Sequence, residues 1–285
     1  MIVCEPTSGL TSRIYVMADA YQLAKDQGQE LIIVWQKTSD CDCFYRDVFD
    51  EKQFADVPHR IIECNRFEYK LRGLMRGHIG ADWNKIIREF WVRITFAVKY
   101  RWTRSALKRQ CTFFKNSYED GNRLLNPEEI QGKNIYIEAY NCITGQRNLS
   151  CIRFQNRFYA KAAKILQGQK CVGIHIRRTD HRPATEGSST DNFIHRMNQI
   201  VEEHPEMKFY VATDDWNEQH KLTQLFGERI LTNSEKVLTR SSREGMEDAV
   251  VDIICLSQTE YILGSYASIF SKFSAEYGGI RLEIV

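Results

Sequence analysis

The segment Lys170–Arg182, with the sequence KCVGIHIRRTDHR, joins an apolar strand to a charged turn. Its first part, Cys171–Ile176, is apolar except for one histidine and has the length of a buried β-strand. The polar residues that lie in or just after this strand are His175, Arg177, Arg178 and Asp180. Because charged side chains are rarely buried without partners, we expect them at the carboxyl end of a central strand, where open α/β sheets bind ligands.

The residues that follow this segment alternate between strand and helix patterns. We predict strands over 171–176, 208–213, 229–232, 260–265 and 280–285. Helices are predicted over 191–204, 216–227, 247–258 and 268–279, where apolar residues recur at helical spacing. Strands that alternate with helices through short connections are typical of a doubly wound, parallel α/β sheet.

The first half of the chain opens with a similar pattern. A strand over 2–5, a helix over 11–27 and a strand over 30–35 form a β-α-β unit, and 60–64 and 134–140 are further strands. We therefore predict an α/β protein with two Rossmann-like doubly wound domains, 1–150 and 151–285, which face each other across a cleft. Such a cleft collects the carboxyl ends of the strands and is the expected ligand site.

Composition narrows the class of protein. The chain has 285 residues, of which 43% are hydrophobic and 27% are charged, as in ordinary globular proteins. No apolar run is long enough to span a bilayer, and the opening MIVCEPTSGL has the pattern of a strand and not of a leader. The nine cysteines are scattered and odd in number, which favours free thiols. Free thiols suit a reducing compartment, so we expect a cytoplasmic protein. Cys41 and Cys43 have no second pair at zinc spacing, so we expect no metal site.

The segment 66–109 is strongly basic and rich in aromatic residues, and only Glu68, Asp82 and Glu89 are acidic in it. Apolar residues at helical spacing predict a long amphipathic helix over 82–100, inserted in the first domain. One interpretation is a core helix with a solvated basic face. The other is a basic face that rests on an anionic membrane surface or meets an acidic acceptor. We expect no nucleic-acid binding, because no recognition motif accompanies the charge.

Two further strands bring polar residues to the predicted rim of the second sheet. Asp214 and Asp215 follow the strand over 208–213, whereas Ser265 ends the strand over 260–265 and Ser268 and Ser271 come after it. Arginine and serine side chains suit phosphate, and carboxylates suit a base or ribose. A P-loop and a G-x-G-x-x-G motif are both missing from the sequence, which argues against common kinases and dehydrogenases. The structural alternatives are a salt-bridge network for the arginines and helix N-caps for Asp215 and the serines.

Three segments resemble the fucosyltransferase superfamily, which includes the α1,2-, α1,6- and protein O-fucosyltransferases. GIHIRRTD (Gly173–Asp180) is similar to its His-x-Arg-Arg-x-Asp motif, FYVATDD (Phe209–Asp215) to its second motif, and Asp252–Glu276 to its third. The segment Ser8–Trp35 resembles its opening more weakly. This resemblance implies a GT-B architecture and inverting, metal-independent transfer of fucose from GDP-fucose to a glycan hydroxyl.

The resemblance also implies roles for individual residues. Arg178 would contact the β-phosphate with Arg177 beside it, and Ser271 would add a hydroxyl. His175 and Asp252 would hold the guanosine. The complete set expected to bind the donor is His175, Arg177, Arg178, Asp214, Asp215, Asp252, Ser268 and Ser271. Without a metal ion, the two guanidinium groups would neutralise the departing diphosphate.

The catalytic base is left open between several residues. Glu186 is the nearest glutamate after the first motif, Asp180 and His181 are alternatives, and some relatives manage without a dedicated base. In the first domain, Ser8-Gly9-Leu10-Thr11-Ser12 replaces the family's Gly-Gly-Leu-Gly-Asn, while Gly9 and Arg13 persist as residues expected to serve the acceptor side. A loop with fewer glycines is stiffer.

Two other functions are compatible with the sequence. A metal-dependent glycosyltransferase would use Asp214 and Asp215 as a metal-binding pair, and a non-catalytic protein would keep only the nucleotide-sugar pocket. For the leading interpretation, the partners are a GDP-sugar and a glycan, lipid-linked or on a surface polysaccharide. The segment 66–109 would shape the acceptor side and bring the protein to the inner face of a membrane.

Overall fold

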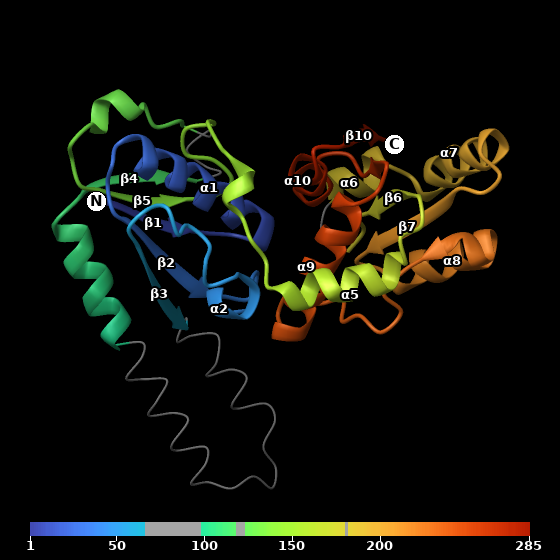
Figure 1. Cartoon of the computed structure of the whole chain (residues 1–285), viewed down its shortest axis with the longest axis horizontal. Helices are drawn as coiled ribbons and strands as arrows, with labels where there is room; N and C mark the ends of the chain where they lie inside the picture. The colour runs from blue at the N-terminus through green and yellow to red at the C-terminus, as the bar shows by residue number, and fades with distance from the viewer. Residues whose placement is uncertain (66–97, 118–122, 180–181) are drawn as a thin grey trace, which may run out of the picture. The chain divides into compact units, whose positions relative to one another are not determined.

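The computed structural model describes residues 1–65, 98–117, 123–179 and 182–285 (Figure 1). Most of the predicted basic insertion, residues 66–97, lies outside the described residues, as do Asp180 and His181. Residues 98–109 are described and helical, as expected for the end of that segment. In the described part of the chain, no helix is long and apolar enough to cross a membrane.

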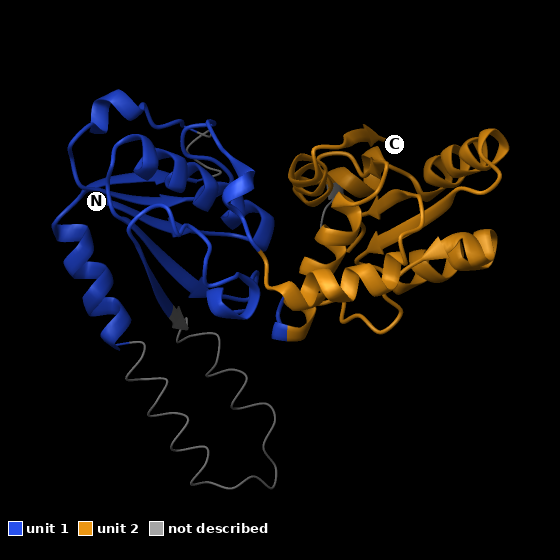
Figure 2. Ribbon diagram, in the orientation of Figure 1, with its two compact units in different colours: residues 1–153, 240–243 blue, residues 154–239, 244–285 orange. Residues whose placement is uncertain are grey.

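The chain forms two compact units (Figure 2). Unit 1 is Met1–Arg153 together with Arg240–Arg243, and unit 2 is Phe154–Thr239 together with Glu244–Val285. The short return of 240–243 to unit 1 is a feature that the sequence did not indicate. It is held by a backbone bond of 3.0 Å from the Asp42 N–H to the Arg240 carbonyl.

Unit 1 is built on a parallel sheet in the order β3-β2-β1-β5-β4. Its strands are β1 (Ile2–Pro6), β2 (Leu31–Lys37), β3 (His59–Asn65), β4 (Thr112–Asn116) and β5 (Ile135–Ala139). The helices are α1 (Leu10–Asp26) and α2 (Tyr45–Val48), with 3-10 turns η2 (Pro127–Ile130) and η3 (Leu149–Cys151). The predicted strands and the long helix are confirmed, whereas β4 and α2 were not predicted. Both are short, and β4 includes a lysine and exposes three of its five residues, so neither has a strong apolar pattern.

Burial explains the central position of β1 and α1. All five residues of β1 are buried, as expected for a strand paired on both sides, here with β2 and β5. Most of α1 is buried around its whole circumference, including the charged residues Arg13 and Asp19. Gly28 then reverses the chain with a φ of 60°, a conformation that glycine adopts without a Cβ clash.

Unit 2 is also a parallel sheet, in the order β10-β9-β6-β7-β8. Its strands are β6 (Cys171–Ile176), β7 (Lys208–Thr213), β8 (Ile230–Leu231), β9 (Tyr261–Gly264) and β10 (Arg281–Ile284). Its helices are α5 (Asn156–Leu166), α6 (Arg182–Gly187), α7 (Thr190–Glu203), α8 (Trp216–Phe226), α9 (Arg243–Ser257) and α10 (Ile269–Gly278), with a turn η4 (Gly227–Arg229). The five strands and the helices α7, α8, α9 and α10 follow the predicted order.

Helices pack on both faces of the second sheet. Val172 and Ile174 of β6 share a core cluster with Met197 of α7 on one face. On the other face Gly173 meets α9, because a Cβ built on this glycine would lie 2.9 Å from the Leu256 side chain. The predicted doubly wound, Rossmann-like architecture is therefore confirmed for the described residues.

In each sheet, the strand that comes first in the chain lies in the centre, and the order in which the chain adds strands reverses there. In unit 1, β1 lies between β2 and β5, and in unit 2, β6 lies between β9 and β7. In open α/β sheets, ligands bind outside the carboxyl ends of the strands at such a reversal. Two places are thus marked by topology alone, the end of β1 near Glu5 and the end of β6 near Arg177.

Candidate functional site

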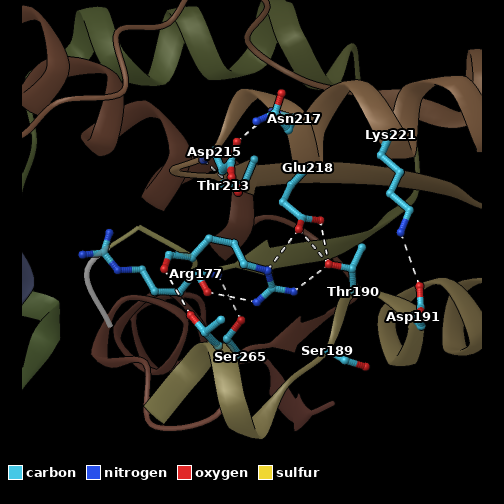
Figure 3. A network of polar contacts seen from close by, with 12 residues as sticks. Arg177, Ser189, Thr190, Asp191, Thr213, Asp215, Asn217, Glu218, Lys221 and Ser265 are labelled. Atoms are coloured by element: carbon cyan, nitrogen blue, oxygen red, sulfur yellow. Dashed lines mark hydrogen bonds and ion pairs between the residues drawn. The ribbon is translucent and has the colours of Figure 1, made fainter. Parts of the chain in front are cut away.

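The turn after β6 presents two arginines at the reversal point of unit 2 (Figure 3). Nη1 of Arg177 lies 2.7 Å from Oδ2 of Asp214, at the end of β7. The backbone N–H of Arg177 donates to Oγ of Ser265, at the end of β9, over 3.0 Å. Three neighbouring strand ends therefore meet at Arg177, whose side chain is still 25% exposed.

Asp214 holds the conformation of the turn Arg177–Thr179, which we call the arginine turn. Its Oδ1 accepts the Arg178 N–H at 2.8 Å, and its Oδ2 accepts both the N–H and the hydroxyl of Thr179. Burial alone would raise the pKa of Asp214, but the Thr179 hydroxyl and the charge of Arg177 outweigh it and lower that pKa below its usual value. The carboxylate therefore stays ionised and serves as an anchor for the loop.

Arg178 is directed into unit 2. Its Nε lies 3.1 Å from Oε1 of Glu218, its Nη2 donates to the Thr190 hydroxyl at 3.0 Å, and its Nη1 donates to the Arg177 carbonyl. Figure 3 shows Glu218 and Thr190 pointing toward one another, joined by a 2.7 Å hydrogen bond. Only 11% of the Arg178 side chain is exposed. Glu218 was not singled out from the sequence, although an acid in the first turn of a helix that begins at this rim was an available signal.

His175 is buried beside the turn. Its ring stacks on Phe270 of α10, with 4.9 Å between centroids and 20° between planes. The pKa of His175 is lowered to about 3, because burial disfavours the imidazolium and the nearby charge of Arg177 repels it. Its Nδ1 is buried and has no hydrogen-bond partner among the described residues. A neutral imidazole with one unused ring nitrogen suits a ligand's polar group.

Asp252 of α9 forms a buried polar cluster with Tyr210 and Lys236, and the charge of Lys236 also acts on His175. Its Oδ1 accepts the Tyr210 hydroxyl at 2.6 Å, and its Oδ2 lies 3.1 Å from Nζ of Lys236. Lys236 is only 1% exposed, which is rare for lysine and is explained by this ion pair. The sequence did not single out Lys236, because a lysine in the connection before α9 is ordinarily a solvated residue.

The three serines after β9 have separate structural contacts. Besides accepting from Arg177, Ser265 donates its hydroxyl to the His175 carbonyl at 3.3 Å. Ser268 is the N-cap residue of α10, but its side chain makes no capping bond. Ser271 is fully buried and donates to the Ser268 carbonyl at 3.2 Å. Ser271 also packs on Gly264, where an added Cβ would lie 2.8 Å from its Oγ.

Asp215 and Glu186 are the remaining predicted residues of unit 2 that the structure describes. Asp215 is the N-cap of α8, where its side chain accepts the Asn217 N–H at 2.8 Å, as the structural alternative predicted. Glu186 is an exposed residue of α6. Within the described ranges, no three His, Cys, Asp or Glu side chains gather in a way that could hold a metal ion.

Unit 1 has a cavity of about 910 Å³ at its own reversal point. It is lined by Glu5 at the end of β1, Gln36 at the end of β2, Glu138 of β5, and the helix over 98–109. Glu5 is 1% exposed and accepts hydrogen bonds from Gln36, Tyr100, Arg104 and Tyr136. Four donors thus compensate the cost of burying this carboxylate.

Arg13 fixes the predicted loop before α1. Its Nε donates to the Ser8 carbonyl at 2.7 Å, its Nη2 to the Thr38 hydroxyl at 2.9 Å, and its Nη1 to the Gln36 carbonyl. Its guanidinium also lies over the Trp35 ring, 4.9 Å from the centroid. Ser8 has a φ of 70°, a region in which glycine is favoured, and Gly9 begins α1 as its N-cap. The loop keeps a glycine-like backbone although serine replaces glycine.

Solved structures of fucosyltransferases share this fold over nearly the whole chain. NodZ alpha-1,6-fucosyltransferase co-crystallised with GDP matches with a TM-score of 0.56 and 13% identity, over 96% of this chain and 90% of that chain. NodZ from Bradyrhizobium matches with a TM-score of 0.56 and 14% identity, over 96% and 91%. POFUT1 in complex with GDP-fucose matches with a TM-score of 0.54 and 9% identity, over 99% and 97%.

These matches confirm, at the level of the fold, the resemblance drawn from the sequence motifs. The chain has the two Rossmann-like domains of the GT-B fucosyltransferases. No protein-family model matches the sequence, and comparison with curated protein sequences gives no match.

Proposed function

We propose that this protein is an inverting, metal-independent fucosyltransferase that transfers fucose from GDP-fucose to a glycan hydroxyl. The observation that carries this proposal is the arginine turn at the reversal point of unit 2, where Arg177 and Arg178 are held by Asp214 and Glu218. The fold shared with fucosyltransferases agrees with that chemistry. In this proposal unit 2 binds the donor and unit 1 binds the acceptor.

The arginine turn would stabilise the leaving diphosphate. As the bond between fucose and phosphate breaks, negative charge grows on the phosphate oxygens, and preorganised cationic donors lower the energy of that state. Arg177 is the more exposed of the two guanidinium groups, and its planar fork of N–H donors matches the oxygens of a phosphate. Arg178 would contribute its charge and fix the turn through Glu218 and Thr190.

The cluster behind the turn would hold the guanosine. Asp252 accepts hydrogen bonds, as the N1–H and N2–H groups of guanine require, and the unused Nδ1 of neutral His175 can meet a further polar group of the nucleoside. Ser268 and Ser271 lie on the neighbouring helix start and complete the donor side. For the base that deprotonates the acceptor hydroxyl, we propose Glu186 or Asp180, with His181 or no dedicated base as the alternatives; of these residues, Glu186 is described and exposed.

Calorimetry with GDP, GDP-fucose, GDP-mannose and a UDP-sugar tests the donor assignment. We expect guanosine nucleotides to bind, uridine nucleotides not to bind, and Arg177→Ala to weaken GDP binding about tenfold or more, as loss of a charged hydrogen bond should. Lys164→Ala, which removes an exposed cation on α5, is the matched control. Preference for a uridine nucleotide would contradict the proposal.

Transfer of labelled fucose to a glycan array, with and without EDTA, tests the reaction. Activity that survives the chelator and gives a product of inverted anomeric configuration supports the arginine mechanism. Loss of activity in EDTA would favour a metal-binding role for Asp214 and Asp215 instead. Tight GDP binding without transfer to any acceptor would identify a nucleotide-sugar-binding protein that does not catalyse the reaction.

A further inference from the structure

The cavity in unit 1 carries more positive than negative charge. Its basic lining residues are Arg13, Arg101, Arg104, Lys108 and Arg109, and its acidic ones are Glu5, Asp40 and Glu138. The cavity lies at the carboxyl ends of β1 and β2, where the order of strands reverses, so topology and charge mark the same place.

Part of this positive charge is neutralised by ion pairs between residues of the lining. Arg104 bridges Glu5 and Glu138 at 2.8 Å each, and Lys108 lies 2.9 Å from Glu138. The third acid, Asp40, faces Arg240 at 3.8 Å. All three carboxylates of the lining therefore already have a cationic partner.

Arg13 is buried and donates to carbonyl and hydroxyl oxygens, and two exposed arginines of the lining also have no carboxylate partner among the described residues. Among the described residues, no carboxylate pairs with Arg101 or Arg109. Both are exposed, and with Ser105 they are spaced by four residues, so they follow one another along the same side of the helix. Eight residues of helix separate the two arginines by about 12 Å, which is long enough to meet an extended ligand.

We propose that this cavity binds an acidic oligosaccharide as the acceptor, with Arg101 and Arg109 pairing with its carboxylate or phosphate groups. This inference rests on the proposed function, because it names the class of acceptor for the same reaction. Arginine offers a planar fork of donors that matches both kinds of acidic group. The hydroxyls of Thr7, Ser39, Ser105 and Tyr100 lie in the same lining and suit sugar hydroxyls. A concave site of about 910 Å³ favours such a ligand over a flat bilayer surface.

Binding is tested by calorimetry with three probes of equal length. These are an oligosaccharide that ends in glucuronic acid, its carboxyl-reduced counterpart that ends in glucose, and that glucose-terminated counterpart phosphorylated at C6. We expect the acidic probes to bind at least tenfold more tightly than the neutral one, with an advantage that shrinks at high salt. The ratio between the two acidic probes distinguishes a carboxylate acceptor from a phosphorylated one.

Substitutions then assign the effect to the two arginines. Arg101→Ala with Arg109→Ala should remove most of the preference for acidic probes and leave GDP affinity unchanged. The control is Lys52→Ala with Lys133→Ala, which removes two exposed cations of unit 1 that do not line the cavity. Equal binding of neutral and acidic probes, or equal loss in the control, would overturn the inference, and so would binding of anionic vesicles that depends on these arginines.

The outcomes separate this inference from the proposed function. Fucose transfer with a preference for the neutral acceptor would leave the proposed function standing and overturn the inference. Acidic probes that bind through Arg101 and Arg109, in a protein that does not bind GDP, would contradict the proposed function and support the anionic site alone.

Discussion

Oδ2 of Asp214 lies 2.7 Å from Nη1 of Arg177, and the same carboxylate accepts the backbone N–H groups of Arg178 and Thr179. One side chain at the end of β7 thus orients both the guanidinium and the backbone of the turn after β6. An ionised carboxylate that is partly buried needs hydrogen-bond donors, and the turn itself supplies them. Arginine and aspartate therefore act as one unit in the predictions below.

Arg177→Lys tests whether the planar fork is required. Lysine keeps the charge but offers a compact ammonium in place of five donors in a plane. We expect kcat for fucose transfer to fall by about 10²-fold, the effect of losing one preorganised donor, while the protein stays folded. Steady-state kinetics and thermal unfolding measure the two quantities. Activity within about twofold of the parent would show that charge alone suffices.

Arg178→Met should lower stability as well as activity. The substitution leaves Glu218 mostly buried without its cation, and we expect a loss on the order of 2 kcal/mol in the free energy of unfolding, between the values for exposed and buried pairs. Urea denaturation measures the loss. Adding Glu218→Gln should restore part of the stability but none of the activity. A double variant no more stable than Arg178→Met would mean that the pair does not contribute as proposed.

Asp252→Asn should abolish discrimination between GDP and IDP. Inosine lacks the N2 amino group of guanine, so a carboxylate that accepts from N1–H and N2–H favours GDP by about tenfold or more. The asparagine amide cannot accept both donors, and we expect the ratio of the two affinities to approach one. Competition calorimetry measures it. Lys236→Met is the companion variant, because it removes the ion pair but keeps the carboxylate. A ratio unchanged in Asp252→Asn contradicts the assignment.

His175 should make the protein less stable in acid. Its folded pKa of about 3 lies below the ordinary value of 6.5, so between these values the unfolded chain binds a proton that the folded chain does not. The contribution of His175 to the free energy of unfolding is therefore full above about pH 6.5. It falls by about 1.4 kcal/mol for each pH unit below that value. His175→Gln should flatten that part of the curve of unfolding free energy against pH. An equal slope in parent and variant would exclude the histidine as its source.

Asp19 should be essential for the fold of unit 1. This fully buried carboxylate of α1 accepts the N–H groups of Ile143, Thr144 and Gly145 at 2.7, 3.1 and 3.3 Å. Asp19→Ala leaves three amides without their acceptor, and we expect a loss on the order of 3 kcal/mol in urea unfolding. Asp26→Asn is a matched control, because Asp26 is exposed at the end of the same helix. Similar losses in both variants would contradict this role.

Strand and helix order could be predicted because each element carries its own pattern. Cys171–Ile176 and Lys208–Thr213 begin and end where predicted, since both are apolar runs bounded by charged or turn residues. β4 was missed because its apolar pattern is weak, with three of its five residues exposed. It is a strand because it pairs with β5. The return of Arg240–Arg243 to unit 1 was missed because it depends on contacts with residues far away in the chain.

The sequence by itself determined the two α/β sheets and the charged turn after β6, because periodicity and strand-end residues are local properties. Only the tertiary structure decided the partners. It paired Arg178 with Glu218, buried Lys236 against Asp252, assigned Asp215 to capping α8, and gathered the cations of residues 98–109 around a cavity at the end of β1. A charged side chain is stabilised by whichever opposite charge folding brings within a few ångströms, and that neighbour is not encoded in sequence spacing.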